Sequence, residues 1–76
     1  MEITKGISVE VFKTSLDSYA ASSQLIKVLL VLYPEAHVNV DLDDCDKILR
    51  IEAANISVDL VSNIVMALGH ECSLLT

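Results

Sequence analysis

The densest group of chemically capable side chains is the stretch DLDDCD at residues 41–46, with four aspartates and one cysteine in six positions. Carboxylate and thiolate groups are ligands for zinc, and His70 would add an imidazole if the fold brought it near. The candidate metal ligands are therefore Cys45, His70, Asp43 and Asp44. The same letters also describe a turn, because Asp side chains hydrogen-bond nearby backbone amides. The turn is the favoured interpretation, and the metal site stays open as an alternative.

Other chemistry is poorly supported by this stretch. It lacks the glycine and the distal glutamate of an EF-hand calcium loop. Cys45 stands between Asp44 and Asp46, whose negative charge opposes formation of a reactive thiolate. The chain also has no recognisable nucleophile–base pair and no phosphate-binding loop. We therefore expect no catalytic residue, no cofactor and no enzymatic activity.

Length and composition limit the classes of protein that remain. A chain of 76 residues makes one domain, residues 1–76, and a domain this small has difficulty hiding its apolar surface. Its hydrophobic fraction is 53%, most of it aliphatic, which makes self-association a candidate property. A net charge of −6 without a basic stripe disfavours nucleic acids and anionic membranes as partners.

Targeting signals are not apparent. The longest apolar run, residues 25–32, is interrupted by Lys27 and is far shorter than the roughly 20 residues that span a bilayer. The first residues do not have the charged and apolar regions of a signal peptide. Two cysteines fit a reducing compartment, in which they stay thiols. We expect a cytoplasmic protein that does not contact the membrane.

Hydrophobic periodicity predicts the first two elements. Residues 7–13 alternate as a strand, with Ile7, Val9 and Val11 expected to face the core and Phe12 to face outward. A helix over 18–33 follows, capped by Asp17 or Ser18 and ended by Pro34. Its expected buried stripe comprises Ala21, Leu25, Val28, Leu29 and Leu32.

The remaining chain predicts a hairpin, a second helix and a last strand. Residues 37–42 and 46–52 alternate as two strands joined at 43–46, with Val38, Val40, Leu42, Leu49 and Ile51 inward. A helix follows from Ser57 to a cap at Gly69, and its buried stripe comprises Val61, Ile64, Val65 and Leu68. Residues 71–75 form a short strand, with Cys72 and Leu74 inward.

This order predicts an α+β fold, the ferredoxin-like βαββαβ arrangement, with a four-stranded antiparallel sheet of order 4-1-3-2. Both helices cover one face of the sheet, and the other face stays open. The loops 14–19, 43–46 and 69–71 meet at one end. The acidic turn and His70 lie toward opposite edges, roughly 14 Å apart, which disfavours a shared metal site.

Apolar side chains outside the expected core are candidates for partner binding. On the open face these are Phe12 and Ile48, beside Arg50, and on the far side of the first helix they are Ile26, Leu30 and Tyr33. As clusters they would form a docking surface for a protein partner or for a second copy of the chain. An edge strand that pairs through its backbone is a further route to a partner.

Two stretches, LIKVLLVLYPEAHVNVDL and ISVDLVSNIVMALGHEC, make the chain resemble a heavy-metal-associated domain, the fold of copper chaperones and of modules in metal-pumping ATPases. The resemblance implies the ferredoxin-like fold. Members of that family hold monovalent copper with two cysteines three residues apart, and the matching positions here are Ser18 and Ala21, so the resemblance does not imply metal transport. The stretch DLDDCDKILRIE is also similar to one in short, uncharacterised bacterial proteins, especially from Bacteroidetes. We therefore expect a non-enzymatic interaction module on this scaffold.

Overall fold

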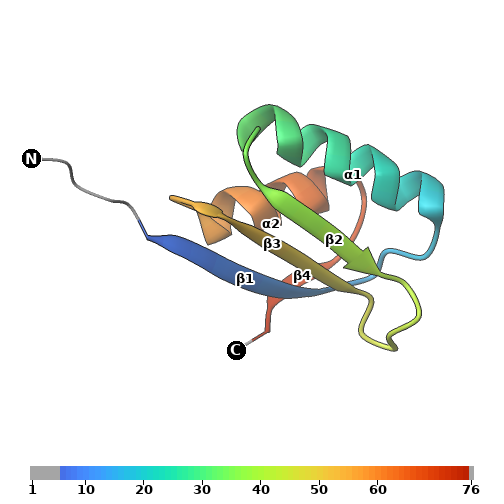
Figure 1. The fold of residues 1–76 in the computed structure, drawn as a ribbon. Coiled ribbons are helices and arrows are strands. Elements are labelled where there is room, and N and C mark those ends of the chain that lie inside the picture. The colour runs from blue at the N-terminus through green and yellow to red at the C-terminus, as the bar shows by residue number, and fades with distance from the viewer. Residues whose placement is uncertain (1–5, 76) are drawn as a thin grey trace, which may run out of the picture.

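The computed structural model describes residues 6–75 and contains six regular elements in the predicted order (Figure 1). Their bounds are β1 (Ile7–Thr14), α1 (Tyr19–Leu32), β2 (His37–Asp41), β3 (Ile48–Ala54), α2 (Val58–Ala67) and β4 (Cys72–Leu74). The sheet is antiparallel with strand order β2-β3-β1-β4, which is the predicted order read from the opposite edge. The α+β ferredoxin-like fold is therefore confirmed. No helix in the described part of the chain is long and apolar enough to cross a membrane.

The molecule has two layers, with α1 and α2 on one face of the sheet and the opposite face uncovered by other elements among residues 6–75 (Figure 1). Each helix begins at a serine cap, as expected. The Ser18 hydroxyl accepts a hydrogen bond from the Ala21 N–H at 3.1 Å, and the Ser57 hydroxyl accepts one from the Leu60 N–H at 3.2 Å. These bonds satisfy amides that have no partner inside the helix.

Between sheet and helices lies a core of eight side chains that are fully buried. They are Phe12, Leu16, Leu25, Leu29, Leu49, Ile51, Val61 and Val65. The inward positions predicted for β2 and β3 are confirmed, since Val38, Val40 and Leu42 pack against this cluster and Leu49 and Ile51 belong to it.

The prediction for β1 was wrong, because the strand faces the other way. Phe12 is 0% exposed, whereas Ile7 is 63% exposed and Val9 is 44% exposed. The register gives the reason. Phe12 pairs with Leu49, and residues directly opposite each other in an antiparallel pair share a face. Since Leu49 faces the helices, Phe12 must face them too.

Two smaller differences concern the first helix and the loop before it. Leu32 was predicted on the buried stripe of α1 but is largely exposed, and Tyr33, just after the helix, packs against the core instead. Leu16, assigned only to a loop, is fully buried. The loop between β1 and α1 therefore contributes a side chain to the core.

Candidate interaction surface

The uncovered face of the sheet carries a row of aliphatic side chains. The register places Ile7, Val9 and Val11 of β1 on this face, together with Ile48 of β3, which pairs with Lys13. We call these four residues the open-face patch. Leu75 borders it, because its N–H donates to the Val11 carbonyl at 2.8 Å.

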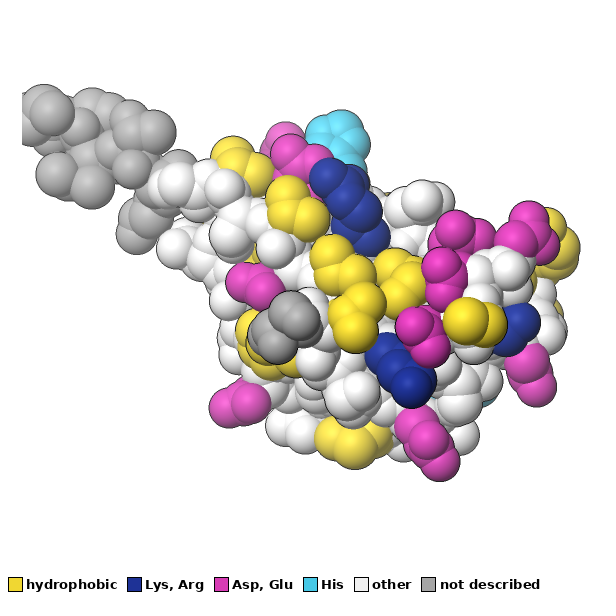
Figure 2. Space-filling view, turned by 90° about the horizontal axis from the view of Figure 1, so that it is seen from below, with side chains coloured by type: hydrophobic (Ala, Val, Ile, Leu, Met, Phe, Trp, Pro, Cys, Tyr) yellow, Lys and Arg dark blue, Asp and Glu magenta, His cyan; other side chains and the backbone are white. Residues whose placement is uncertain are grey.

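Figure 2 views this face and shows hydrophobic side chains gathered near its centre, with basic and acidic side chains around them. A soluble sheet with one free face ordinarily alternates apolar residues inward and polar residues outward. β1 departs from that pattern, since three of its outward positions are Ile or Val. Isolated exposed aliphatic residues are common on proteins, but a contiguous group is typical of a contact surface.

Charged residues on the open face come in equal numbers of each sign. The register places Lys13 and Arg50 there, together with Asp41 and Glu52. Arg50 Nη1 lies 3.7 Å from Glu52 Oε1, and the side chains of both residues are over one third exposed. Such a surface ion pair stabilises a protein by only about 0–1 kcal/mol, so its charges remain available to a partner.

Of the three partner candidates predicted on the sheet face, two are found there. Ile48 is half-buried on the open face, and Arg50 is exposed beside it. Phe12 is not on this surface, because it lies in the core. In its place the face presents Val9 and Val11, which were expected inward. The strand pairing would have identified them, since alternation alone does not decide which side of β1 faces the core.

The three candidates on α1 are dispersed. Leu30 is only partly exposed, and Ile26 lines a groove of about 450 Å³ between α1 and β2. Tyr33 is not free to dock, because its side chain packs against the core and its hydroxyl accepts a hydrogen bond from the Ser57 N–H at 3.0 Å. Val31, which was not predicted, is 80% exposed and stands on the outer side of this helix.

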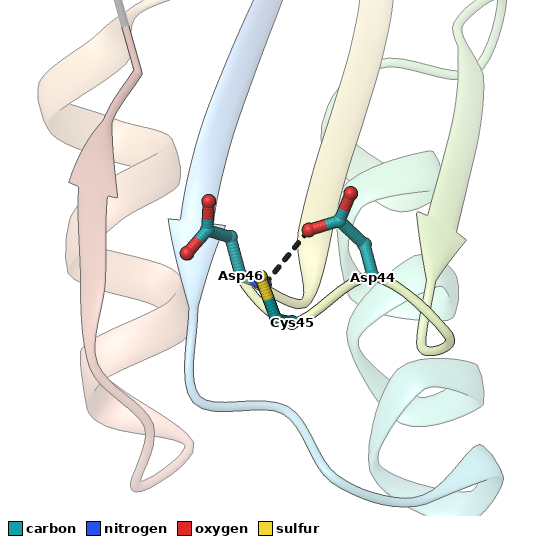
Figure 3. Close-up of side chains that lie close together, drawn as sticks. All are labelled: Asp44, Cys45 and Asp46. Carbon is teal, nitrogen blue, oxygen red and sulfur yellow. Dashed lines mark hydrogen bonds between the residues drawn. The ribbon is translucent and has the colours of Figure 1, made fainter.

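The acidic stretch forms the turn between β2 and β3 and uses its own carboxylates to build it. Asp41 Oδ1 accepts from the Asp43 N–H at 3.1 Å, and Asp44 Oδ1 accepts from the Asp46 N–H at 2.8 Å (Figure 3). Each of these two hydrogen bonds closes a local turn of the kind in which Asp is the favoured residue. Lys47 closes the turn with a φ of 49°, and its Nζ donates to the Leu42 carbonyl.

Thr14 ties this turn to the end of β1, a connection that was not predicted. Its N–H donates to the Asp46 carbonyl at 3.1 Å, and its hydroxyl donates to the Lys47 carbonyl at 2.6 Å. The same hydroxyl accepts from the Leu16 N–H at 3.2 Å. Ser15 makes the corresponding link to the loop before β4, accepting from the Glu71 N–H at 2.8 Å. The expectation that the three loops meet at one end is therefore met.

Among residues 6–75, one group of metal-ligating side chains is close enough to share an ion. Ligand atoms of Asp44, Cys45 and Asp46 all lie within 4.8 Å of one another, and Figure 3 shows the two carboxylates on either side of the thiol. His70 and Asp43 are not part of this group. The alternative of a site shared by Cys45 and the His70 imidazole, which the strand order disfavoured, is not formed, and Asp44, Cys45 and Asp46 sit on a turn where Cys45 is exposed.

The two thiols differ in environment. Cys72 is partly buried against the core, and burial raises the pKa of its thiol, while a 3.8 Å hydrogen bond to the Ser62 hydroxyl acts in the opposite direction. Cys72 is therefore held more firmly as the neutral thiol. Cys45 and Cys72 are both free thiols.

Ser18 and Ala21, which the proposed resemblance would align with the cysteine pair of heavy-metal-associated domains, are engaged in the cap of α1. The hydrogen bond from the Ala21 N–H occupies the Ser18 hydroxyl, and the Ser22 hydroxyl adds a bond to the Ser18 carbonyl at 3.0 Å. Neither side chain offers sulfur to a soft metal ion. No protein-family model matches the chain, and a comparison with curated proteins found no match.

Proposed function

We propose that this protein is a non-enzymatic interaction module that binds another protein chain through the open face of its sheet, on a scaffold that resembles a heavy-metal-associated domain without its cysteine pair. One observation carries the proposal. The open-face patch is a contiguous aliphatic surface that nothing in residues 6–75 covers, in a domain whose core is complete without it.

The polar surroundings of the patch support the same function. Protein interfaces combine an apolar centre with a charged and hydrogen-bonding rim. Here Arg50 and Glu52 provide charges of both signs within reach of the apolar centre. The central strands of the exposed sheet, β1 and β3, are each hydrogen-bonded to a neighbour on both sides, which restricts their backbone. A rigid surface loses little conformational entropy when a partner docks.

Photo-crosslinking tests this function. A benzoylphenylalanine introduced at Val9 is expected to capture a protein partner, and Ile48→Asp in the same chain is expected to abolish the adduct. The matched control carries the crosslinker at Val31, which is more exposed but lies on α1. Capture from position 31 alone, or capture at position 9 that Ile48→Asp does not reduce, would contradict the proposal.

A second candidate function is metal binding at the rim, supported by the spacing of Asp44, Cys45 and Asp46. It ranks lower because Asp44 already accepts a backbone hydrogen bond and the group contains no imidazole, His70 lying outside it. Zinc titration with observation of the Cys45 and Asp46 amide signals separates the two candidates. Saturable binding at micromolar zinc, lost in Cys45→Ser, would favour the metal function.

A further inference from the structure

The open face is complementary to the open face of a second copy whose strands run in the reverse direction. Along β1 and β3 the register pairs Val9 with Glu52 and Val11 with Arg50. Consider a two-fold axis that runs parallel to the plane of the sheet, perpendicular to the strands and midway between these two pairs. Rotation about this axis lays β3 of one copy over β3 of the other, running in the reverse direction. Each Arg50 then lies over a Glu52, and each Val9 over a Val11.

We propose, extending the function above, that the occupant of the open face is a second copy of this chain, docked about that two-fold axis. The apolar centre of the interface is Val9 and Val11 from both copies. Two reciprocal Arg50–Glu52 ion pairs lie beside it, along β3, and fix the direction of docking. A two-fold interface uses the same patch on both copies, so one self-complementary surface is sufficient.

Other two-fold placements bring unfavourable groups together. An axis running along β3 would stack Arg50 on the second copy's Arg50 and Glu52 on its Glu52, which are like charges. An axis along the strands midway between β1 and β3 would set Arg50 over the second copy's Val11 and bury both charges against aliphatic groups. Juxtaposed like charges and unpaired buried charges each weaken an interface. The perpendicular axis avoids both for Arg50 and Glu52. It sets each Lys13 over the second copy's Ile7 at the outer end of β1, where the long Lys13 side chain can extend its charge to solvent.

Net charge does not prevent this pairing. The chain carries −6, but the charged side chains that the register places on the open face, Lys13, Arg50, Asp41 and Glu52, sum to zero. The acidic excess therefore lies elsewhere in the chain. At physiological salt, charges separated by more than about 8 Å are largely screened. Two open faces, unlike two randomly chosen surfaces of this protein, approach without strong repulsion.

The expected association is weak and concentration-dependent. Three strand spacings of about 4.8 Å and six residues rising about 3.3 Å each give a projected face of roughly 14 by 20 Å per copy. Such an interface falls in the class that buries less than about 1,200 Å² in total, which is typical of weak or transient contacts. The dimer is therefore expected to dissociate readily on dilution.

Charge reversal tests the pairing by sedimentation equilibrium. Arg50→Glu places two acidic residues at positions 50 and 52, and Glu52→Arg places two basic ones there. Each variant alone is expected to self-associate at least about tenfold more weakly than wild type. An equimolar mixture is expected to recover association, because acidic positions then face basic ones across the interface.

Recovery on mixing has no explanation within one chain, since both variants lack the internal Arg50–Glu52 pair. Variants that associate as wild type, or a mixture that stays monomeric, would overturn the proposed dimer. Ile48→Asp and Val31→Asp provide a matched pair of controls, with only the first expected to weaken association.

The crosslinking experiment separates failure of the dimer from failure of the interaction function. An adduct from position 9 at twice the mass of the chain supports both claims. An adduct with a different protein only, with no self-adduct, overturns the dimer and leaves the interaction function standing. Absence of any adduct from position 9 contradicts both.

Discussion

Truncating Phe12 tests the assignment of the two faces of β1, because Phe12 and Val9 lie on opposite faces of the same strand. Phe12 is 0% exposed within the eight-residue core, and Phe→Ala changes at such sites cost about 3–5 kcal/mol. A 76-residue domain has a total free energy of unfolding of roughly 4–11 kcal/mol. Phe12→Ala should therefore remove roughly a quarter or more of the free energy of unfolding.

Val9→Ala should have a much smaller effect on the monomer. Its side chain is 44% exposed, and complete burial of a valine contributes only about 1.5–3 kcal/mol. Since alanine retains the Cβ atom, the expected loss is below about 1 kcal/mol. A difference of at least about threefold between two apolar residues three positions apart would follow from the register alone.

Urea unfolding of both variants, followed by circular dichroism, measures the two losses. The protein is kept dilute, because self-association would add stability that depends on concentration. If Phe12→Ala does not fold, Phe12→Leu gives the milder comparison, still expected to cost more than Val9→Ala. Equal losses for Phe12→Ala and Val9→Ala, with unchanged dependence on urea, would refute the face assignment.

Three other predictions concern the loop end of the sheet. Thr14→Val keeps the shape of the side chain but leaves the Lys47 carbonyl and the Leu16 N–H without their hydrogen bond. Chemical denaturation should show a decrease of roughly 2–4 kcal/mol in the free energy of unfolding, and a decrease below about 0.5 kcal/mol would contradict the role given to Thr14. Cys45 should react with a thiol reagent much faster than Cys72, whose raised pKa delays its reaction until the pH exceeds the usual thiol range; equal rates at pH 8 would argue against the burial of Cys72. Ser18→Cys combined with Ala21→Cys should bind monovalent copper more tightly than wild type does, as measured by competition with a chromogenic chelator. A folded double variant that binds no better than wild type would weaken the resemblance to heavy-metal-associated domains.

Most of the fold could be predicted because its local signals agree with one another. Serine caps mark the start of both helices, Pro34 follows the first, and β2 and β3 alternate with one clearly apolar side. β1 was the exception, since one of its sides carries Ile7, Val9 and Val11 and the other carries Phe12. The direction it faces depends on which residue stands opposite Leu49, and that pairing is a property of the sheet rather than of the strand.

The sequence predicted that the candidate surface lies on the uncovered face of the sheet, but it predicted only some of the residues on that face. Ile48 and Arg50 were assigned correctly because β3 alternates cleanly, whereas the β1 residues were exchanged between core and surface. The acidic turn was recognised from its aspartates, but the contribution of Thr14 was not. No local pattern indicates that a threonine at the end of one strand will bond to the backbone of a turn 33 residues away.

A dilution series of amide spectra would locate the contact surface in solution. Between millimolar and low micromolar protein, the largest shift changes are expected at Val9, Val11, Ile48 and Arg50, with Val31 on α1 unchanged. Shifts of this kind would place the contact on the outer side of β1 and β3, as inferred. Concentration-dependent shifts confined to α1 or to the edge strand β2, with the outer side of β1 unaffected, would contradict the account.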